Sequence, residues 1–429
     1  MPTRTKSFLS SFYISEQDVS QAIRSISPKM SNTPEGIPSF VLKQIAPSVV
    51  KPLAFIFQQS LYNGVVPNQW KISLVKPIHK SGSRNKVTNY RPVALTSAIC
   101  RVMEKIIKNK ILVHLQMNSL LSDHQHWFIP GRSTTTQLLS CMNNWLNDYN
   151  NNKDVHIIYT DFTKAFDRVC HEKLLQVLFS VGIRGNLLQW IRSYLTNRIQ
   201  RVMIRSEISS PLKVISGVPQ GSVLGPLLFT IFVNDISEVC TKQCHISLIA
   251  DDCKIYSNCP ESLQLTLNNL KKFTDTRQLC LAPHKCMYVN INRRNKVPQV
   301  FSIGSQILKE EESIKDLGVI ISSSLKPSSH IQKICQKAYH RLFQILSSFR
   351  SSNIWILMRA YKIYIRPILE HNSVTWNPIL VRDVKLIEKV QMVFLKKVFI
   401  RCGIKSFNYQ HRLKMCNLET LELRRKKMT

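Results

Sequence analysis

Two adjacent carboxylates, Asp251 and Asp252, lie between two stretches with strand-like apolar character, 246–249 and 253–256. This pattern predicts a strand, a tight turn and a second strand, with the two acids at the tip. Unpaired neighbouring carboxylates repel each other and resist desolvation, so a divalent cation between them would account best for the arrangement. An arbitrary Asp-Asp pair is more often a surface turn. The apolar pattern on both sides favours a metal site here, provided that a third carboxylate joins the pair.

Asp161 is the candidate for that third carboxylate. Val155, Ile157, Tyr159 and Asp161 alternate along the chain and would share one face of a strand, which would deliver Asp161 at its end. A lone Asp after a strand more often caps a helix. Its pairing with Asp251 and Asp252 reverses that preference and predicts a site built from three carboxylates.

A glycine-rich turn over 216–222 separates the acids in the sequence. Gly217 and Gly221 permit close backbone approach, and Gln220 offers amide donors and acceptors. Ser222 is placed to cap a helix that runs toward residue 234. The spacing matches neither G-x-x-x-x-G-K-[ST] nor G-x-G-x-x-G, so the turn does not support an NTPase or a dinucleotide-binding fold.

A basic hairpin is predicted upstream, from a strand over 70–80, a turn over 81–85 and a second strand over 89–95. It would expose Lys80 and Arg91. Together they could grip a triphosphate, with Lys80 as a point charge and Arg91 as a bidentate fork. Taken alone, such a hairpin is more often a solvated basic ribbon.

The amino-acid composition indicates which class of molecule the chain binds. The chain has 429 residues, with 59 Lys and Arg against 26 Asp and Glu, a net charge of +33, and 44% apolar residues. The apolar fraction supports a sizeable core and argues against disorder. A charge this large implies a polyanionic partner, and nucleic acid is favoured over an anionic membrane because the basic residues are spread along the whole chain.

Other common classes of site and segment are not supported. The 12 cysteines are scattered and no secretory signal precedes them, so we expect reduced thiols. The nearest approach to a zinc pattern, at 240, 244, 245 and 253, fits no standard spacing. No apolar run approaches the ~20 residues of a membrane span.

The remaining pattern is helical. Helices are predicted over 15–27 with Ser15 as N-cap, and over 40–45, 53–61, 98–116 and 135–147. After residue 318 three more helices follow, near 331–349, 354–369 and 384–399, and each carries a basic face. On the first of these, Lys333, Lys337 and Arg341 are expected to hold nucleic-acid phosphates, although charged helix faces are usually just solvated. The basic run over 423–427 predicts a basic tail or a nuclear signal.

The order of these parts resembles the reverse transcriptases of non-LTR retrotransposons of the jockey and chicken-repeat type. Each match is modest alone, but they follow the family's order through nearly the whole chain. They are Pro77 to Lys80, Asn89 to Pro92, Pro130 to Ser133, Asp161 to Asp167, Gly217 to Phe229, Ala250 to Asp252, Lys285-Cys286, Lys315 to Val319 and Tyr364 to Glu370.

The resemblance assigns a role to each candidate residue. Asp161, Asp251 and Asp252 would hold two Mg²⁺ about 4 Å apart, with Mn²⁺ as a substitute. Lys80 and Arg91 would bind the incoming dNTP, and Gln220 and Gly221 would lie against the nascent base pair. Phe166 matches a steric gate that blocks a ribose 2′-hydroxyl; plain core packing is the alternative. Lys285 matches a lysine that protonates the pyrophosphate, with a phosphate contact or a surface position as alternatives. Arg132 and Ile249 fall at nucleic-acid-facing positions.

The implied fold is an α+β right-hand polymerase, with fingers, a palm built on an antiparallel sheet and a helical thumb. We expect an N-terminal extension and fingers over 1–150, a palm over 151–325 and a thumb with a basic C-terminal region over 326–429. The reverse transcriptase domain of fingers and palm would cover about 60–325. The implied partners are an RNA template, a DNA primer and dNTPs, with no membrane, and the implied location is the nucleus and cytoplasm. Relatives carry an endonuclease upstream, which we expect here as a separate protein.

Several residues depart from the family's pattern. Glu35 replaces an Asp, Trp127 a Gly, Ile129 an Arg and Ala282 an Asn, and Ile249 stands where a Tyr or Phe is usual. Two functions from different classes are therefore open: an active RNA-directed DNA polymerase, or a catalytically impaired remnant or co-opted nucleic-acid-binding protein. The intact acids, Gln220, Lys80 and Arg91 favour the first. A group II intron maturase is a weaker third candidate, because the region after Tyr364 resembles the retrotransposon type more closely.

Overall fold

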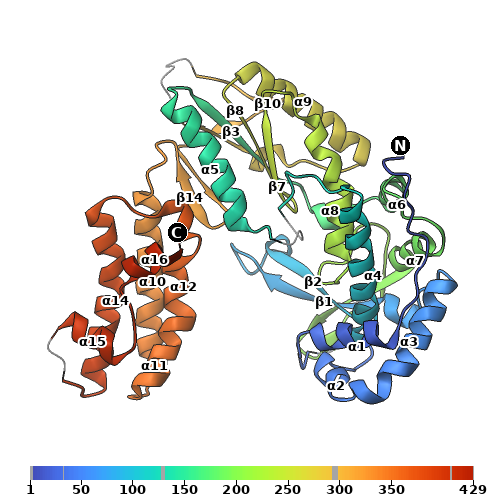
Figure 1. The fold of residues 1–429 in the computed structure, drawn as a ribbon, viewed down its shortest axis with the longest axis horizontal. Helices are drawn as coiled ribbons and strands as arrows, with labels where there is room; N and C mark the ends of the chain where they lie inside the picture. Colours follow the sequence, from blue (N-terminus) through green and yellow to red (C-terminus); the bar gives the residue numbers. More distant parts are fainter. Residues whose placement is uncertain (1–2, 32, 127–130, 292–297, 406–407, 429) are drawn as a thin grey trace.

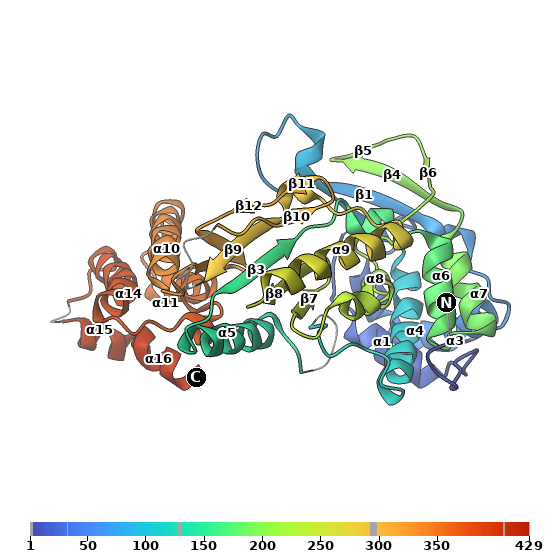
Figure 2. The same cartoon turned by 90° about the horizontal axis from the view of Figure 1, so that it is seen from above.

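The computed structural model describes residues 3–31, 33–126, 131–291, 298–405 and 408–428. Two mixed sheets lie in the middle of the molecule, with the helices of residues 16–117 on one side and a helical C-terminal region on the other (Figure 1). Seen from above, the C-terminal helices stand at the far end of the central strands from the N-terminal helices (Figure 2). No helix among the described residues is both long and apolar enough to cross a membrane.

The N-terminal sheet contains the predicted basic hairpin. Its strands run in the order β2-β1-β4-β5, with β6 also paired to β4. The antiparallel β1–β2 register places Ile78 opposite Arg91, which confirms the hairpin. Strand β4 adds to β1 in parallel. The strands are β1 (Ile72–His79), β2 (Tyr90–Thr96), β4 (Arg198–Ile204), β5 (Glu207–Ile208) and β6 (Leu212–Val214).

The central sheet carries the acidic segments in the order β12-β9-β3-β8-β7. Strand β3 lies between β8 and β9 and is antiparallel to both, so both of its edges are hydrogen-bonded, and its residues are almost all buried. The strands are β3 (Val155–Thr160), β7 (His245–Ile249), β8 (Asp252–Ser257), β9 (Met287–Ile291) and β12 (Lys309–Glu310); separate two-stranded hairpins are β10 (Ser302–Ile303) with β11 (Gln306–Ile307) and β13 (Ser313–Asp316) with β14 (Val319–Ser322).

Helices from the first two thirds of the chain surround the sheets. Ser15 caps α1 through a reciprocal pair of bonds with Asp18, as predicted. The helix expected over 53–61 begins earlier, at Ala46, and contains Pro52. Burial of its apolar face outweighs the lost hydrogen bond at the proline. These helices are α1 (Glu16–Ser25), α2 (Ser39–Gln44), α3 (Ala46–Tyr62), α4 (Ala98–Met117), α5 (Thr134–Asn150), α6 (His171–Ser180), α7 (Gly185–Leu195), α8 (Gly225–Val233) and α9 (Pro260–Arg277).

The C-terminal region confirms the three predicted helices. The one expected over 354–369 is divided into α11, a π-helical segment (Tyr361–Ile365) and α12. Pro367 cannot donate the next helical hydrogen bond, and a widened turn just before it accommodates that loss. The helices are α10 (Ser328–Ser348), α11 (Ile354–Ala360), α12 (Arg366–Glu370), α13 (Ser373–Trp376), α14 (Val381–Arg401), α15 (Tyr409–Met415) and α16 (Leu421–Met428).

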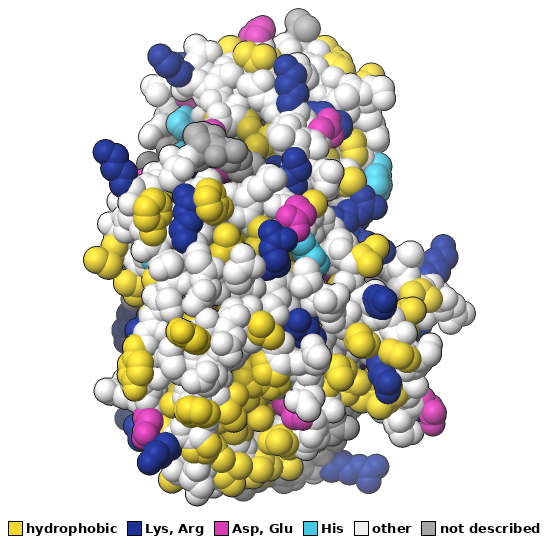
Figure 3. Space-filling view, turned by 90° about the vertical axis from the view of Figure 1, so that its right-hand side faces the viewer, with side chains coloured by type: hydrophobic (Ala, Val, Ile, Leu, Met, Phe, Trp, Pro, Cys, Tyr) yellow, Lys and Arg dark blue, Asp and Glu magenta, His cyan; other side chains and the backbone are white. Residues whose placement is uncertain are grey.

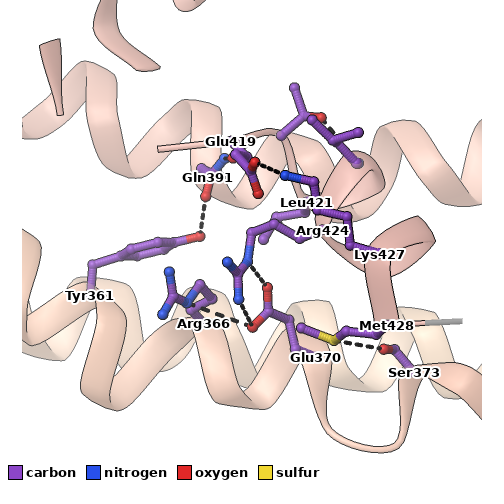
Figure 4. Close-up of polar contacts among 12 residues, drawn as sticks. Tyr361, Arg366, Glu370, Ser373, Gln391, Glu419, Leu421, Arg424, Lys427 and Met428 are labelled. Atoms are coloured by element: carbon purple, nitrogen blue, oxygen red, sulfur yellow. Dashed lines mark hydrogen bonds and ion pairs between the residues drawn. The ribbon is translucent and has the colours of Figure 1, made fainter. Parts of the chain in front are cut away.

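The C-terminal basic run is not a free tail, and that prediction is corrected here. It forms α16, which lies against the other C-terminal helices (Figure 4). Arg424 Nε and Nη2 bond the two oxygens of Glu370 at 2.5 and 3.1 Å, while Arg425 is only 1% exposed. Lys427 pairs with Glu419. The sequence pattern showed the charges but not the carboxylates that face them.

Two hydrophobic cores share the central sheet. The first packs the helices of the N-terminal part against one face, through residues such as Ile158 and Ile255. The second joins the other face, through Ile157 and Tyr256, to α5 and to the C-terminal helices. The predicted alternation along 155–159 is therefore confirmed, because successive residues of β3 enter different cores.

The N-terminal helices also expose an apolar surface. Apolar side chains gather in the lower part of the face shown in Figure 3, where Figure 1 places the first helices. Phe55 and Tyr62 of α3 are each 68% exposed, and Phe40 of α2 is also exposed. Contiguous exposed apolar surface of this kind is typical of contact surfaces.

Acid should weaken the junction between β14 and α10 through His330. Its Nδ1 accepts a bond from the Ile320 N–H at 3.2 Å, and the side chain is 2% exposed. Burial, with repulsion from His371, lowers the pKa of His330 to about 4. A lowered histidine pKa contributes stability that is complete above the unfolded pKa of roughly 6.5 and is lost as pH falls toward 4. The free energy of unfolding should therefore fall by roughly 2 kcal/mol between pH 7.5 and pH 5.

Urea unfolding at the two pH values measures this effect. His330→Phe should be less stable at pH 7.5 because the Ile320 N–H loses its acceptor, but its stability should change less with pH. His340→Gln, at an exposed position of the same helix, is the matched control and should keep the wild-type pH dependence. An equal pH dependence in His330→Phe would contradict the assignment.

Candidate active site

The three predicted carboxylates meet at one end of the central sheet. Thr160 pairs with Cys253 across β3 and β8, so Asp161 and Asp252 are the next neighbours beyond that pair. Ile249 pairs with Asp252, which leaves Ala250 and Asp251 as the turn between β7 and β8. Ala250 has φ +52°, a left-handed conformation that a tight two-residue turn requires. The predicted strand–turn–strand with acids at its tip is confirmed.

Electrostatics show that these groups act on one another. Burial and the charge of Asp161 raise the pKa of Asp251, whereas Arg91 and Lys80 lower it. Burial first, and then repulsion from Asp251, raise the pKa of Asp252 to about 6. The basic hairpin therefore faces the acidic tip, as the predicted triphosphate grip requires. The Lys285 Nζ lies 3.3 Å from Asp161 Oδ2, so this lysine also belongs to the cluster.

The carboxylates suit ions that arrive with a substrate. Among the described residues, no three His, Cys, Asp or Glu side chains converge closely enough to hold a metal by themselves. Mg²⁺ usually binds one or two carboxylates and completes its shell with water and substrate phosphates, so this donor set fits it. Burial, and after it repulsion between the carboxylates, raise the pKa values of Asp251 and Asp252, and a bound cation would relieve the repulsion.

Phe166, five residues after Asp161 in the chain, has a fixed position. It lies in a short 3₁₀ segment (Ala165–Arg168), and its ring stacks on Phe229 at 4.5 Å between centroids. Its carbonyl accepts a bond from the Val218 N–H at 2.8 Å. Gly217 has φ +88°, and a Cβ there would come within 2.7 Å of the Phe166 carbonyl oxygen. The glycine-rich turn and the Phe166 segment are therefore packed backbone to backbone.

Gln220 is held from two sides. Its Nε2 donates to Asp167 Oδ1 at 2.9 Å, and its carbonyl accepts from the Ala94 N–H of β2 at 2.6 Å. A Cβ at Gly221 would lie 2.3 Å from the Ala94 carbonyl oxygen, so the close approach that this glycine permits is to β2. A contact of Gly221 with the nascent base pair stays a prediction. Asp167 was part of a matched motif, but the sequence assigned it no role.

A buried glutamate supports the same turn and was missed from the sequence. Glu104, on α4, is 0% exposed. Its Oε2 accepts from the N–H groups of Val223 and Leu224 at 2.8 and 2.9 Å, directly before α8. The predicted serine cap is corrected, because the N-cap of α8 is Leu224; Ser222 Oγ instead accepts from the N–H of Gly225, the first residue of the helix, at 2.9 Å. The one available signal for Glu104 was an acid among the apolar positions of a predicted helix.

In this structure Arg132 is hydrogen-bonded to other residues of the chain. Its Nη1 donates to the carbonyl oxygens of Asp123 and Gln125 at 2.6 and 2.8 Å, and its Nη2 to Asp123 Oδ1 at 2.8 Å. The segment it holds bridges to β7 at Leu248. Arg132 therefore supports the acidic hairpin from outside, and its predicted contact with nucleic acid stays a prediction.

The basic residues of α10 line a groove. Lys333, Lys337 and Arg341 are exposed and border a cavity of about 680 Å³. Its other walls come from the β13–β14 hairpin and from the segment around Tyr364, and we call it the basic groove. The basic side chains of α10 suit a phosphate backbone, and the nucleic-acid contacts of these three residues stay predictions.

Ile249 is 3% exposed and packs within the sheet rather than on the surface. Its contact with nucleic acid stays a prediction, and Ile249→Tyr tests it. If the position lies near the primer end, a tyrosine should restore a ring that grips the primer and lengthen the products of a single binding event, measured with an excess of unlabelled trap. Unchanged product lengths would assign Ile249 to core packing alone.

Of the residues that depart from the family's pattern, some lie outside the described residues and others make backbone hydrogen bonds. Trp127, Ile129 and Pro130 lie outside the described residues. Glu35 Oε1 accepts from the Ala98 N–H at 2.6 Å and so holds the start of α4. Ala282 is buried, and its N–H donates to the Asp161 carbonyl at 2.8 Å, which helps to hold that ligand.

Comparison with known proteins gives concordant results. A family model described as reverse transcriptase (RNA-dependent DNA polymerase) matches residues 78–321. A probable RNA-directed DNA polymerase from transposon BS of Drosophila melanogaster is 27% identical over 84% of this chain and 42% of the relative. The RNA-directed DNA polymerase from mobile element jockey of the same species is 28% identical over 74% of this chain and 36% of the relative.

This chain thus spans about two fifths of the length of these curated relatives. Among solved structures, telomerase from Candida albicans, in complex with a fragment of telomeric RNA, aligns over 89% of this chain and 65% of that one. The TM-score is 0.44 at 10% identity.

Proposed function

The chain belongs to the reverse transcriptase (RNA-dependent DNA polymerase) family, and from this premise we propose that it is the RNA-directed DNA polymerase of a non-LTR retrotransposon. It would add dNTPs to a primer 3′-hydroxyl as an RNA template directs. The observation that carries the proposal is the meeting of Asp161, Asp251 and Asp252 at the end of the central sheet, under Lys80 and Arg91. We assign residues 1–150 to the N-terminal extension and fingers, 151–325 to the palm and 326–429 to the thumb.

The family generally depends on divalent metal, and the three aspartates are the residues that would hold two Mg²⁺. Bound there, the ions would supply activation of the primer 3′-hydroxyl and charge neutralisation on the pyrophosphate. Lys80 and Arg91 bind and orient the triphosphate from the hairpin. Lys285 is the candidate that gives a proton to the pyrophosphate, and its Nζ lies 3.3 Å from Asp161 Oδ2, within the same cluster.

Phe166 and Gln220, the rigidly held residues of the site, would select the nucleotide. The Phe166 ring, stacked on Phe229, would leave no room for a ribose 2′-hydroxyl. Asp167 fixes the amide of Gln220, which would lie against the nascent base pair. Template RNA and DNA primer would follow the basic groove and the other basic helix faces. Cooperation with an endonuclease activity and a nuclear and cytoplasmic location complete the proposal.

Primer extension tests it. The protein, an RNA template, a DNA primer and dNTPs should give extended products with Mg²⁺, none after chelation with EDTA, and products again when Mg²⁺ or Mn²⁺ is restored in excess. Omitting the RNA template is the matched control. Absent extension together with salt-sensitive RNA binding would contradict the polymerase and identify a nucleic-acid-binding protein instead.

A further inference from the structure

A buried ion pair lies beside the carboxylates. Lys254 Nζ is 2.5 Å from Asp316 Oδ2, and the two side chains are 4% and 5% exposed. The Tyr159 hydroxyl donates to the same Asp316 oxygen at 3.1 Å. Removing two charges from water costs nearly as much as their attraction returns, so a pair like this is a poor source of stability. The best-attested use of such pairs is to specify one arrangement of the parts they join.

One member of the pair, Lys254, lies on a strand that carries a carboxylate. Lys254 follows Asp252 by two residues on β8, so the two side chains lie on the same face of the sheet. Tyr159 is directly opposite Lys254 on β3 and precedes Asp161 by two residues. On each strand that carries a carboxylate, the residue two positions away on the same face, Lys254 or Tyr159, therefore contacts Asp316.

The other member, Asp316, lies on the β13–β14 hairpin, which contacts the C-terminal helices. Asp316 is the last residue of β13, and the Leu317 carbonyl that follows lies 3.1 Å from His371 Nε2. Gly318 has φ +92°, and a Cβ there would meet the same His371 nitrogen at 2.9 Å. Asn372, beside His371, accepts a bond from Thr135 of α5 at 2.5 Å. The hairpin tip is thus fixed against the C-terminal region, next to the basic groove.

We propose that Lys254 and Asp316 are positioning residues, which fix the acidic hairpin relative to the β13–β14 hairpin and thereby to the nucleic acid held by the C-terminal region. This inference rests on the proposed polymerase function. The pair touches neither the predicted triphosphate grip nor Phe166, so its loss should misplace the primer end relative to the carboxylates while dNTP binding is kept.

The test is to replace the pair by apolar residues of similar size. Lys254→Met or Asp316→Leu alone leaves a buried charge and should destabilise the fold, whereas the double variant should unfold near the wild-type urea midpoint. In single-turnover extension the double variant should lose about 10- to 100-fold in rate, since small misplacements of reacting groups cost that much. Its KM for dNTP should change by less than about twofold, because the triphosphate grip is intact.

A matched double variant separates positioning from general packing. Arg277 and Asp235 form another buried pair at 2.5 Å, with 4% and 8% exposure; both lie on helical segments that carry none of the three carboxylates, and Asp235 also pairs with Arg4. Arg277→Met with Asp235→Leu should keep the wild-type extension rate. Tyr159→Phe removes only the hydroxyl that binds Asp316, so it should fold normally and still extend more slowly. A wild-type rate in either folded variant, the Lys254/Asp316 double or Tyr159→Phe, would overturn the proposal.

Amide hydrogen exchange tests the same proposal without any activity. In the Lys254/Asp316 double variant, or in Tyr159→Phe, residues 249–253 and 315–319 should exchange at least about tenfold faster, because the contact that closes both segments is weakened. Unchanged exchange would contradict the proposal even if the wild-type protein proves inactive. An inactive wild type with faster exchange in the variants would instead contradict the polymerase function alone.

Discussion

Asp251→Asn should lower the rate of nucleotide addition by on the order of 10³-fold while leaving the fold intact. The substitution replaces a charged metal ligand by a neutral amide of the same shape. Burial and the charge of Asp161 already oppose ionisation of Asp251. Without divalent ions the variant should therefore be at least as stable as the wild type, because the repulsion is relieved. Single-turnover extension gives the rate, and urea unfolding in EDTA gives the stability.

The matched control for this substitution is Asp275→Asn. Asp275 is an exposed carboxylate on α9 that pairs with Lys271 one helical turn away, so the change has the same chemistry outside the site. It should extend primers at the wild-type rate. Extension by Asp251→Asn within tenfold of the wild type would remove Asp251 from the metal site.

Phe166→Ala should admit ribonucleotides, raising kcat/KM for a ribonucleotide relative to its deoxy counterpart by roughly 10²-fold. Phe166 cannot move aside easily, because its ring stacks on Phe229 and its carbonyl is bonded to Val218. Removing the ring opens the space that a 2′-hydroxyl needs. The measurement is steady-state incorporation of dGTP and GTP opposite the same template base.

Phe229→Leu is the companion to this test. It keeps the Phe166 ring but removes its stacking partner, so the ring gains freedom and discrimination should fall by a smaller factor. Continued refusal of ribonucleotides by Phe166→Ala, with normal incorporation of dGTP, would show that Phe166 only packs the core and that another group reads the sugar.

Local pattern was sufficient to predict the parts of the site that lie within one stretch of chain. The acids at the tip of the β7–β8 hairpin follow from apolar residues on both sides, and Asp161 follows from alternation along β3. The β1–β2 hairpin follows from two strand-like runs and a polar turn between them. In each case the residue and the signal for its position are within about ten positions of each other.

The supporting contacts could not be predicted, because their partners are distant in the chain. Glu104 binds the backbone of Val223 and Leu224, more than a hundred residues away, and Lys254 pairs with Asp316 across 62 positions. Periodicity reveals which face of an element is buried, not what lies opposite it. For the same reason the charges of α16 suggested a tail, although Arg424 faces Glu370.

The sharing of the central sheet between two cores has a consequence for biosynthesis. Strands β3 and β8 leave the ribosome well before α10 and α14, whose side chains complete the second core on Ile157 and Tyr256. Until α10 has emerged, α5 and the β13–β14 hairpin are the described elements of this core that can cover that face of the nascent sheet, and α14 completes it later. A partly covered apolar sheet on a ribosome-bound chain is a binding site for chaperones and a risk for aggregation. Yield of active protein should therefore respond to chaperone supply during translation more than to conditions applied after release.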